Sequence, residues 1–250
     1  MPHRFFIILK SFYQNFLDLL FPWQCVFCQK ESDNPYPLCS NCLKQIIINQ
    51  DFICPYCSQL IIKPHHHNYR NKNLYLRALG IATSYQNPIV KNTIHSFKYQ
   101  NLISLSLPLA NLIIEFLEQS LFFKNLLSNS KDKLLIIPIP LHYFKKIKRG
   151  YNQVELLAEK VSCHFNIPYN TKILKRIKNN PPQVNFSAKE RYLNTKNIFD
   201  INKNNISLIN QKIILLMDDV YTTGATLNEA AKVLKQNGAR EVIGIAVAKG

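Results

Sequence analysis

The 250-residue sequence has no uninterrupted apolar run long enough to span a membrane. Its first 24 residues are rich in apolar side chains, but Lys10, Gln14, Asn15 and Asp18 interrupt them well short of the roughly 20 residues that a span needs. No small-residue cleavage site follows, and the apolar FFIIL run is too short for the core of a signal peptide. We therefore expect a cytoplasmic chain without a membrane span.

The apolar residues of this N-terminal stretch recur at near-helical spacing, which predicts a helix within residues 1–24. Two interpretations of that helix stay open. It docks on its own protein, or it contacts a partner or the inner face of the membrane. The residues that set the spacing are Phe5, Ile8, Leu9, Phe12, Phe16, Leu19 and Leu20.

Acidic side chains are also scarce. The chain has 15 Asp and Glu residues against 31 Lys and Arg residues, which gives a formal net charge of +16. Such an excess favours polyanionic partners, namely nucleic acid, phosphorylated small molecules or an anionic membrane surface. Because the chain is rich in Lys, Asn and Ile throughout, the charge is equally consistent with a biased genome. The apolar fraction of 47% is ample for a packed core.

Six of the seven cysteines fall in one short region as three Cys-x-x-Cys pairs, CVFC, CSNC and CPYC. In a reducing cytoplasm, such pairs are metal ligands far more often than disulfides. A two-residue spacer lets both thiolates of one turn bind a tetrahedral zinc ion, and a second such turn completes the four ligands. We therefore predict a zinc site formed by Cys25, Cys28, Cys39 and Cys42.

The third pair, Cys54 and Cys57, has no matching fourth pair. The three histidines at positions 65–67 either complete a second metal site or are simply solvated. Cys163 lies alone in an apolar, helical pattern, and we expect it to be a buried small hydrophobe.

A polar, linker-like stretch ends the cysteine-rich module near residue 73. We expect three parts: an N-terminal helix over 1–24, a zinc-ribbon module over 25–73 and an α/β domain over 74–250. In the last part, strand-like runs at 76–85, 133–140, 212–217 and 241–248 alternate with helical patterns at 107–120, 151–165 and 227–238. Continuous apolar strands alternating with helices predict a parallel sheet flanked by helices.

One of these strands ends in the segment IILLMDDVYTTGAT. Ligands of open parallel sheets bind beyond the carboxyl ends of the strands, where Asp218 and Asp219 are expected. The amides and hydroxyls that follow suit a phosphate at a helix start, whereas two carboxylates suit the hydroxyls of a ribose. The segment therefore predicts a ribose 5-phosphate site, with capping acids and an ordinary loop as the alternative. The predicted phosphate loop is Thr222, Thr223, Gly224, Ala225 and Thr226.

The same segment resembles the phosphoribosyl pyrophosphate (PRPP) motif of type I phosphoribosyltransferases. The cysteine module with FPWQCVFC, PIPLHYFKKIKRGYNQ and PPQVNFSAKERYLNTKNIF resembles the ComF (ComFC) family of competence-associated proteins. The resemblance runs from about residue 21 to residue 250. The chain departs from the family at HHHNYRNKN, where many relatives carry a fourth cysteine pair, and this puts a second metal in doubt.

The resemblance implies a site for PRPP with Mg²⁺, in which a ribosyl group is transferred and pyrophosphate leaves. Basic side chains would neutralise the leaving group. Residues 138–141 would form the pyrophosphate loop, with Lys148 and Arg149 as its cations beside the acids Asp218 and Asp219. The alternative for the basic run is a solvated helix face. Residues 151–153, Tyr-Asn-Gln, look like a family element without a derivable role.

Three functions follow from these observations. The first is a phosphoribosyltransferase with an unidentified acceptor. The second is a protein of competence-linked DNA uptake that contacts single-stranded DNA and DNA-translocation proteins, and the third is a PRPP-sensing regulator. We predict a PRPP-binding ComF-type protein of the second kind. Residues 181–199 would form a lid or a DNA contact, and the aromatics of the cysteine module would stack on bases: Phe27, Tyr36, Tyr56 and Tyr69.

Overall fold

A computed structural model describes residues 23–61, 74–178 and 197–250. The helix predicted within residues 1–24 and the lid predicted over residues 181–199 lie almost entirely outside the described residues. The same holds for the histidines at positions 65–67 and for Tyr69.

The centre of the molecule is a four-stranded sheet in the order β1-β6-β5-β2, and all three pairings are parallel. Its strands are β1 (Ala78–Ser84), β2 (Leu134–Pro138), β5 (Ile213–Tyr221) and β6 (Glu241–Lys249). Nearly every side chain of these strands is buried, because helices cover both faces of the sheet. The predicted α/β fold with a parallel sheet is confirmed.

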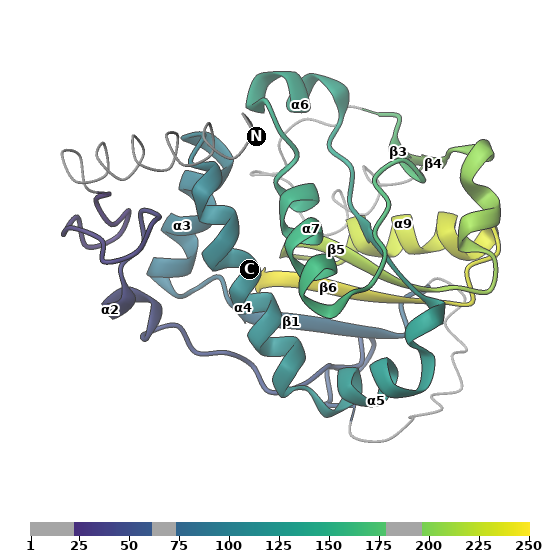
Figure 1. Ribbon diagram of the computed structural model, residues 1–250. Helices are drawn as coiled ribbons and strands as arrows, with labels where there is room; N and C mark the ends of the chain where they lie inside the picture. Colours follow the sequence, from purple (N-terminus) through teal and green to yellow (C-terminus); the bar gives the residue numbers. More distant parts are fainter. Residues whose placement is uncertain (1–22, 62–73, 179–196) are drawn as a thin grey trace, which may run out of the picture.

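Four helices pack on one face of the sheet and one long helix packs on the other (Figure 1). The first group is α3 (Pro88–Tyr99), α4 (Ser106–Gln119), α5 (Leu121–Ser130) and α7 (Gln153–Phe165). The opposite face carries α9 (Ala225–Gln236), together with a small antiparallel pair of strands. That pair is β3 (Leu174–Arg176) and β4 (Phe199–Ile201).

Short elements complete the described chain. A single helix, α6 (Tyr143–Arg149), lies between β2 and α7 and projects beyond the rest of the molecule at the top of Figure 1. The remaining ones are α2 (Ser40–Leu43), η1 (Ile103–Leu105), η2 (Lys131–Lys133) and η4 (Lys203–Ile209).

Each predicted strand and helix of the α/β domain is present, with ends that differ by a few residues. The prediction that Cys163 is a buried hydrophobe is wrong, because its side chain is exposed. The buried face of α7 carries Val154, Leu157, Ala158 and Val161 at spacings of three and four residues. Cys163 comes two residues after Val161, and this rotation along a helix places it on the outer side.

The cysteine module continues into the edge of the sheet (the purple segment of Figure 1). Ile53 and Leu79 of β1 exchange two backbone hydrogen bonds of 2.9 and 3.0 Å. Next to this pair, Phe52 is fully buried against Phe116 of α4, with the ring centroids 5.2 Å apart. The two rings pack so closely over Gly80 that a Cβ there would lie 2.6 Å from Phe52. The module and the sheet therefore share one core, and a boundary near residue 73 stays a prediction.

Among the described helices, none is by itself long and apolar enough to cross a membrane. One bent pair, Ile103–Gln119 with Leu121–Lys133, meets the length and composition required, and its halves meet at 81°.

Candidate functional site

Four cysteines of the N-terminal module converge on one point. The sulfurs of Cys25, Cys28, Cys39 and Cys42 all lie within 4.8 Å of one another, and three of the four residues are buried. The Cys25–Cys42 and Cys28–Cys39 sulfur pairs are each 3.7 Å apart. In a tetrahedral site with Zn–S bonds of about 2.3 Å, the sulfurs lie about 3.8 Å apart. Two of the sulfur–sulfur distances therefore match a tetrahedral zinc site, and all four thiols lie close enough together to bind one ion.

The Cys54–Cys57 turn has the same backbone as the Cys25–Cys28 turn. In both turns, the backbone amide of the first cysteine donates to the carbonyl of the residue five positions later. The amide of the residue four positions later donates to the carbonyl of the same cysteine. The fifth residue of each turn, Gln29 or Ser58, has a left-handed φ of 60° or 58°. Within the described residues, however, only the first four cysteines form a cluster of metal-ligating groups.

A cleft of about 510 Å³ opens at the carboxyl ends of β5 and β2, where the sequence predicts a ligand. It brings together Asp218, Asp219, Lys148, Arg149 and Thr226 of the predicted site. The cations of α3 and β3, which the sequence did not mark, also line it, as does the amide of Gln153, for which the sequence indicated no role. Among the described residues, the lining is Lys98, Tyr99, Asn101, Ile139, Leu141, Lys145, Lys148, Arg149, Gln153, Val154, Arg176, Asp218, Asp219 and Thr226.

Asp219 is held by two donors from different helices. The Lys98 ammonium of α3 donates to Asp219 Oδ1 at 2.7 Å, and the Gln153 amide of α7 donates to Asp219 Oδ2. Burial alone would lower the pKa of Lys98, but the Asp219 carboxylate outweighs this and raises it. The ion pair is thus charged, and together with the Gln153 hydrogen bond it ties both helices to the end of β5.

Asp218 lines the cleft in a different environment. Its Oδ1 accepts the backbone N–H of Asp219 at 2.8 Å. Burial and the neighbouring Asp219 charge raise the pKa of Asp218 to about 7, although the Asp219 N–H, Lys98 and Arg176 oppose the shift. Its carboxyl group therefore changes charge near neutral pH, and a ligand that needs a carboxylate here should bind better as pH rises.

The turn after β5 presents backbone amides at the start of α9. Gly224 has a φ of +76°, and a Cβ on it would lie 2.5 Å from the Tyr221 hydroxyl oxygen, so only glycine fits. Ala225 begins α9, and its amide approaches Thr223 Oγ1 at 3.5 Å. Thr222 and Thr223 are exposed, and Thr226 lines the cleft. Amides, hydroxyls and a helix start thus meet where a phosphate would bind.

Comparison with known proteins assigns a domain to each of the two regions that hold these residues. A double zinc ribbon model matches residues 16–70, and a phosphoribosyl transferase domain model matches residues 133–249. Competence protein F of Haemophilus influenzae is 34% identical over 226 residues, which cover 89% of this chain and 82% of the relative. The chain belongs to the ComF family. The cysteine cluster and the zinc ribbon match together support a structural zinc site.

Further ComF relatives are similar over much of the chain. Competence protein ComFC of Bacillus subtilis is 31% identical over 224 residues, which cover 86% of this chain and 84% of the relative. The DNA utilization protein YhgH of Salmonella typhimurium is 26% identical over 163 residues, or 65% of this chain and 68% of the relative.

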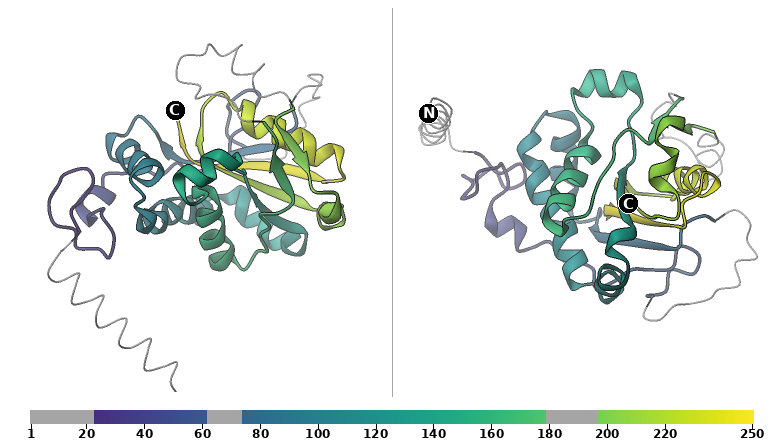
Figure 2. Two further views of the ribbon diagram at one scale, coloured as in Figure 1. Left: turned by 90° about the horizontal axis from the view of Figure 1, so that it is seen from above. Right: turned by 45° about the vertical axis from the view of Figure 1, so that its right-hand side comes forward.

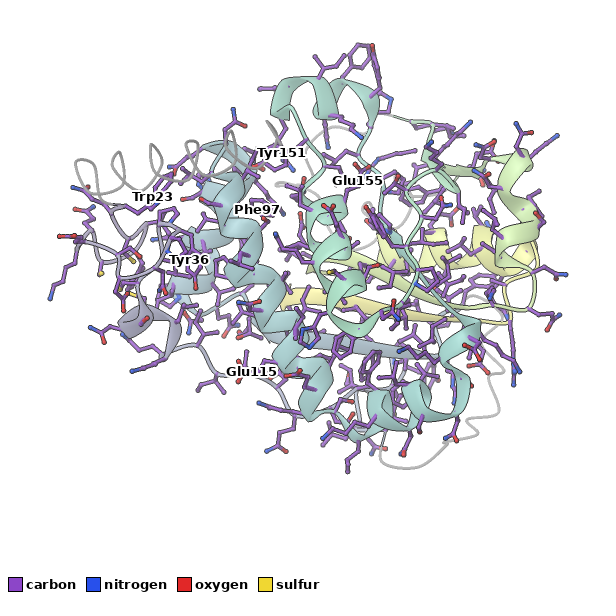
Figure 3. The ribbon with its side chains drawn as sticks, viewed as in Figure 1. Trp23, Tyr36, Phe97, Glu115, Tyr151 and Glu155 are labelled. Carbon is purple, nitrogen blue, oxygen red and sulfur yellow. The ribbon has the colours of Figure 1, made fainter. Side chains whose placement is uncertain are left out.

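The structure gives each residue of the Tyr-Asn-Gln element of ComF a role. The Tyr151 hydroxyl donates to the Phe97 carbonyl at the end of α3 (Figure 3). The Asn152 side chain caps α7 and donates to the Ile139 carbonyl in the predicted pyrophosphate loop at 3.1 Å. Gln153 then reaches Asp219. The element therefore joins α3, α7, the loop after β2 and the acidic end of β5.

Five cations line the cleft, and three of them come from α6. Lys145, Lys148 and Arg149 lie three and four residues apart, so one side of α6 faces the cleft. Burial and the charges of Arg176 and Arg149 lower the pKa of Lys145. The prediction of cations beside the acids thus has a structural counterpart. Sequence reasoning missed Lys98 and Arg176, because a single cation in a helix or strand carries no local signal.

The aromatic residues predicted to stack on bases differ in their exposure. Tyr36 is buried, and Phe27 is half-buried against the core of the cysteine module (Figure 3 labels Tyr36). Tyr56 is exposed, and Tyr69 lies outside the described residues. The prediction of a stacking surface is wrong for Tyr36, because its ring belongs to the buried core of the module, and it stays a prediction for the other three residues.

Proposed function

We propose that the cleft binds PRPP, or a closely related 5-phosphoribosyl compound, together with Mg²⁺. We also propose that this ComF chain uses the site in competence-linked handling of single-stranded DNA in the cytoplasm. One observation carries the first part: two carboxylates lie near the end of β5, shortly before the turn that begins α9, in a cleft whose described lining has five cations. The competence and DNA utilization names of the relatives support the second part.

In the proposed complex, Asp218 and Asp219 hold the ribose hydroxyls. Asp219 retains capacity for this, because each carboxylate oxygen can accept more than one hydrogen bond. The amides and hydroxyls from Thr222 to Thr226 hold the 5-phosphate at the start of α9. Lys148 and Arg149 bind the pyrophosphate, and we add Lys145 and Arg176, which line the same cleft.

The residues of the cleft fit a magnesium ion that arrives with the ligand. Magnesium in such sites is held by one or two carboxylates together with substrate phosphates. Among the residues that line the described cleft, Asp218 and Asp219 are the carboxylates, and both oxygens of Asp219 already accept hydrogen bonds. Asp218 would therefore be the main protein ligand. The ion would neutralise the diphosphate when bound.

Two alternatives share this binding site. If an acceptor reaches the ribosyl carbon, the cations Lys145, Lys148, Arg149 and Arg176 would stabilise the charge of departing pyrophosphate, and the chain would be a phosphoribosyltransferase. If no acceptor reaches it, the chain would sense PRPP without turnover. Release of pyrophosphate in the presence of candidate nucleobases separates the two. A third type of partner, the competence and DNA-translocation proteins, follows from the proposed role.

The test is a calorimetric titration with PRPP and Mg²⁺, with and without a single-stranded oligonucleotide. We expect saturable binding in the wild type and none in the Asp218→Ala/Asp219→Ala variant. The control Asp132→Ala removes a carboxylate from the exposed Lys131–Lys133 turn and should bind as the wild type does. Equal affinity in the double variant and the wild type would reject the assignment of the site. A shift in affinity when DNA is present would link the two parts of the proposal.

A further inference from the structure

The short helix α6 has its apolar side chains on the outside. Tyr143, Phe144 and Ile147 are 69%, 64% and 61% exposed, and none of the residues in α6 is buried. Figure 1 and the right-hand view of Figure 2 both show the helix projecting from the described molecule. Large apolar side chains gathered on a projecting element mark an interaction site more often than a chance exposure.

The two sides of α6 have different chemistry. Lys145, Lys148 and Arg149 face the cleft, whereas Tyr143 and Ile147, four residues apart, share the outer side next to Phe144. The helix contains four cations and no acid. Aromatic rings on α6 therefore lie directly beside a row of positive charges.

The aromatic surface continues on α3. Tyr99 at the end of α3 is 68% exposed, and the Arg149 guanidinium carbon lies 5.4 Å from the centre of its ring. The exposed His95 ring also packs on Tyr99, with the ring centroids 4.8 Å apart. Tyr99 also lines the cleft, so the exposed rings and the cationic cleft are continuous.

We propose that this α6 surface, made of Tyr99, Tyr143, Phe144 and Ile147 with the flanking Lys148 and Arg149, binds single-stranded nucleic acid. Bases stack on the exposed rings, and Lys148 and Arg149 contact the phosphates of the strand when PRPP does not occupy them. Rings interleaved with cations are the chemistry that binds single strands without sequence preference. The inference rests on the proposed role in single-stranded DNA handling and assigns that role a surface.

The arrangement fits a single strand better than a lipid surface. A helix that lies in a membrane interface buries its apolar side in lipid and directs its cations to the anionic headgroups around it. In α6, three of the four cations point into the cleft, away from the plane that the apolar side would touch. Seven residues also bury little area, whereas each stacked base adds its own contact.

Fluorescence anisotropy with a labelled oligothymidylate of about 20 nucleotides tests the surface, because this probe is single-stranded and lacks sequence-specific contacts. Because two stacking rings are lost, Tyr143→Ala/Phe144→Ala should weaken binding at least about tenfold. The same variant should keep its PRPP affinity, because neither residue lines the cleft. The matched control Tyr56→Ala removes an exposed ring from the cysteine module and should bind the oligonucleotide as the wild type does.

Each outcome separates this surface from the proposed function. If the wild type binds the oligonucleotide and Tyr143→Ala/Phe144→Ala binds it equally well, the α6 surface is wrong and the DNA role stands. If Tyr56→Ala alone weakens binding, the cysteine module is the surface instead. A wild type that binds no oligonucleotide overturns the surface and the DNA role together, while PRPP binding is judged separately. Binding to vesicles of phosphatidylserine and phosphatidylcholine, lost in the double variant and without DNA binding, would assign the surface to lipid.

Discussion

The cysteine cluster and the acidic end of β5 both gather groups that repel one another when charged, but they balance this repulsion differently. At the end of β5, the chain supplies its own partners, since Lys98 and Gln153 donate to both oxygens of Asp219. In the cluster, four sulfurs lie within 4.8 Å of one another, and thiolates so close need a cation among them.

This difference separates what each region needs in order to form. The cleft is built by contacts within the protein, so its ligand meets a prepared site, and removal of the ligand should leave the fold intact. Cys25, Cys39 and Cys42 are themselves part of the buried core of the cysteine module, so bound zinc should be part of its folding free energy. Substitutions in the cleft should therefore reduce ligand binding, whereas substitutions of the zinc ligands should unfold the cysteine module.

The largest effect is expected from Cys39→Ser/Cys42→Ser. Zinc contributes about 10–16 kcal/mol to small zinc-binding modules, which matches or exceeds the total stability of an ordinary domain, so the module should unfold without it. The zinc-to-protein ratio, measured by atomic absorption, should fall by one. PRPP affinity should fall less than in Asp218→Ala/Asp219→Ala, because the cleft has its own supports.

The control for this prediction is Cys163→Ser. It makes the same chemical change at an exposed position of α7 and should alter neither zinc content nor stability. A zinc ratio in Cys39→Ser/Cys42→Ser equal to that of the wild type would show that these cysteines hold no metal.

A smaller effect is expected from Lys98→Met, which keeps the length of the side chain and removes its charge. The Asp219 carboxylate would then be buried without its cation, and breaking such a pair costs about 3–5 kcal/mol. Urea denaturation should show this loss in the free energy of unfolding. Lys98→Met/Asp219→Asn should recover much of it, because the uncompensated charge is gone. Equal stability of the two variants would mean that the ion pair does not balance Asp219.

Gln153→Met should have a still smaller effect on stability. It removes a neutral donor from Asp219 Oδ2 and leaves the Lys98 contact in place, so about 1–3 kcal/mol should be lost. The comparison with Lys98→Met in the same denaturation series tests whether charge or hydrogen bonding holds the acidic pair. A loss as large as that of Lys98→Met would show that the amide and the cation act as one unit.

Sequence patterns predicted the features whose structure is determined by residues close together in the sequence. The apolar run of β5, the Asp218–Asp219 pair and the Gly224 turn are all read within one segment, as are the paired cysteine turns. These features depend on strand burial, turn geometry and metal spacing, which are local rules. The parallel sheet and the position of the cleft followed from them.

The supports of the site were not predictable in this way. Lys98 is 121 positions from Asp219 along the chain, and Gln153 is 66 positions from it. Only the packing of α3 and α7 on the sheet brings them to the same carboxylate. The exposed rings of α6 were hidden for another reason. Aromatic residues in a helical pattern normally predict a buried face. The sequence gives no sign that these rings are exposed, which depends on how the other described elements pack.

The smallest expected effect concerns the charge of Asp218, whose pKa is raised to about 7 in the folded protein. If the ribose hydroxyls and Mg²⁺ need its carboxylate, PRPP affinity should rise about tenfold from about pH 6 to about pH 8. Stability of the unliganded protein should move the other way. Because the folded state binds the proton more tightly than the unfolded state, the contribution of this group is lost as pH rises from about 4 to about 7.

These opposite signs make the prediction specific to Asp218, since few other groups raise affinity and lower stability over the same range. PRPP has phosphate groups that titrate near pH 6, so the comparison must be made with Asp218→Asn, which keeps the shape of the side chain. Calorimetric titration of this variant should show a flatter dependence on pH, with only the contribution of the ligand left. An unchanged slope in Asp218→Asn would place the titrating group in the ligand or elsewhere in the cleft. In that case groups of the protein would compensate the charge of Asp218 as fully as Lys98 and Gln153 compensate that of Asp219. The acidic pair would then carry the same charge with and without ligand.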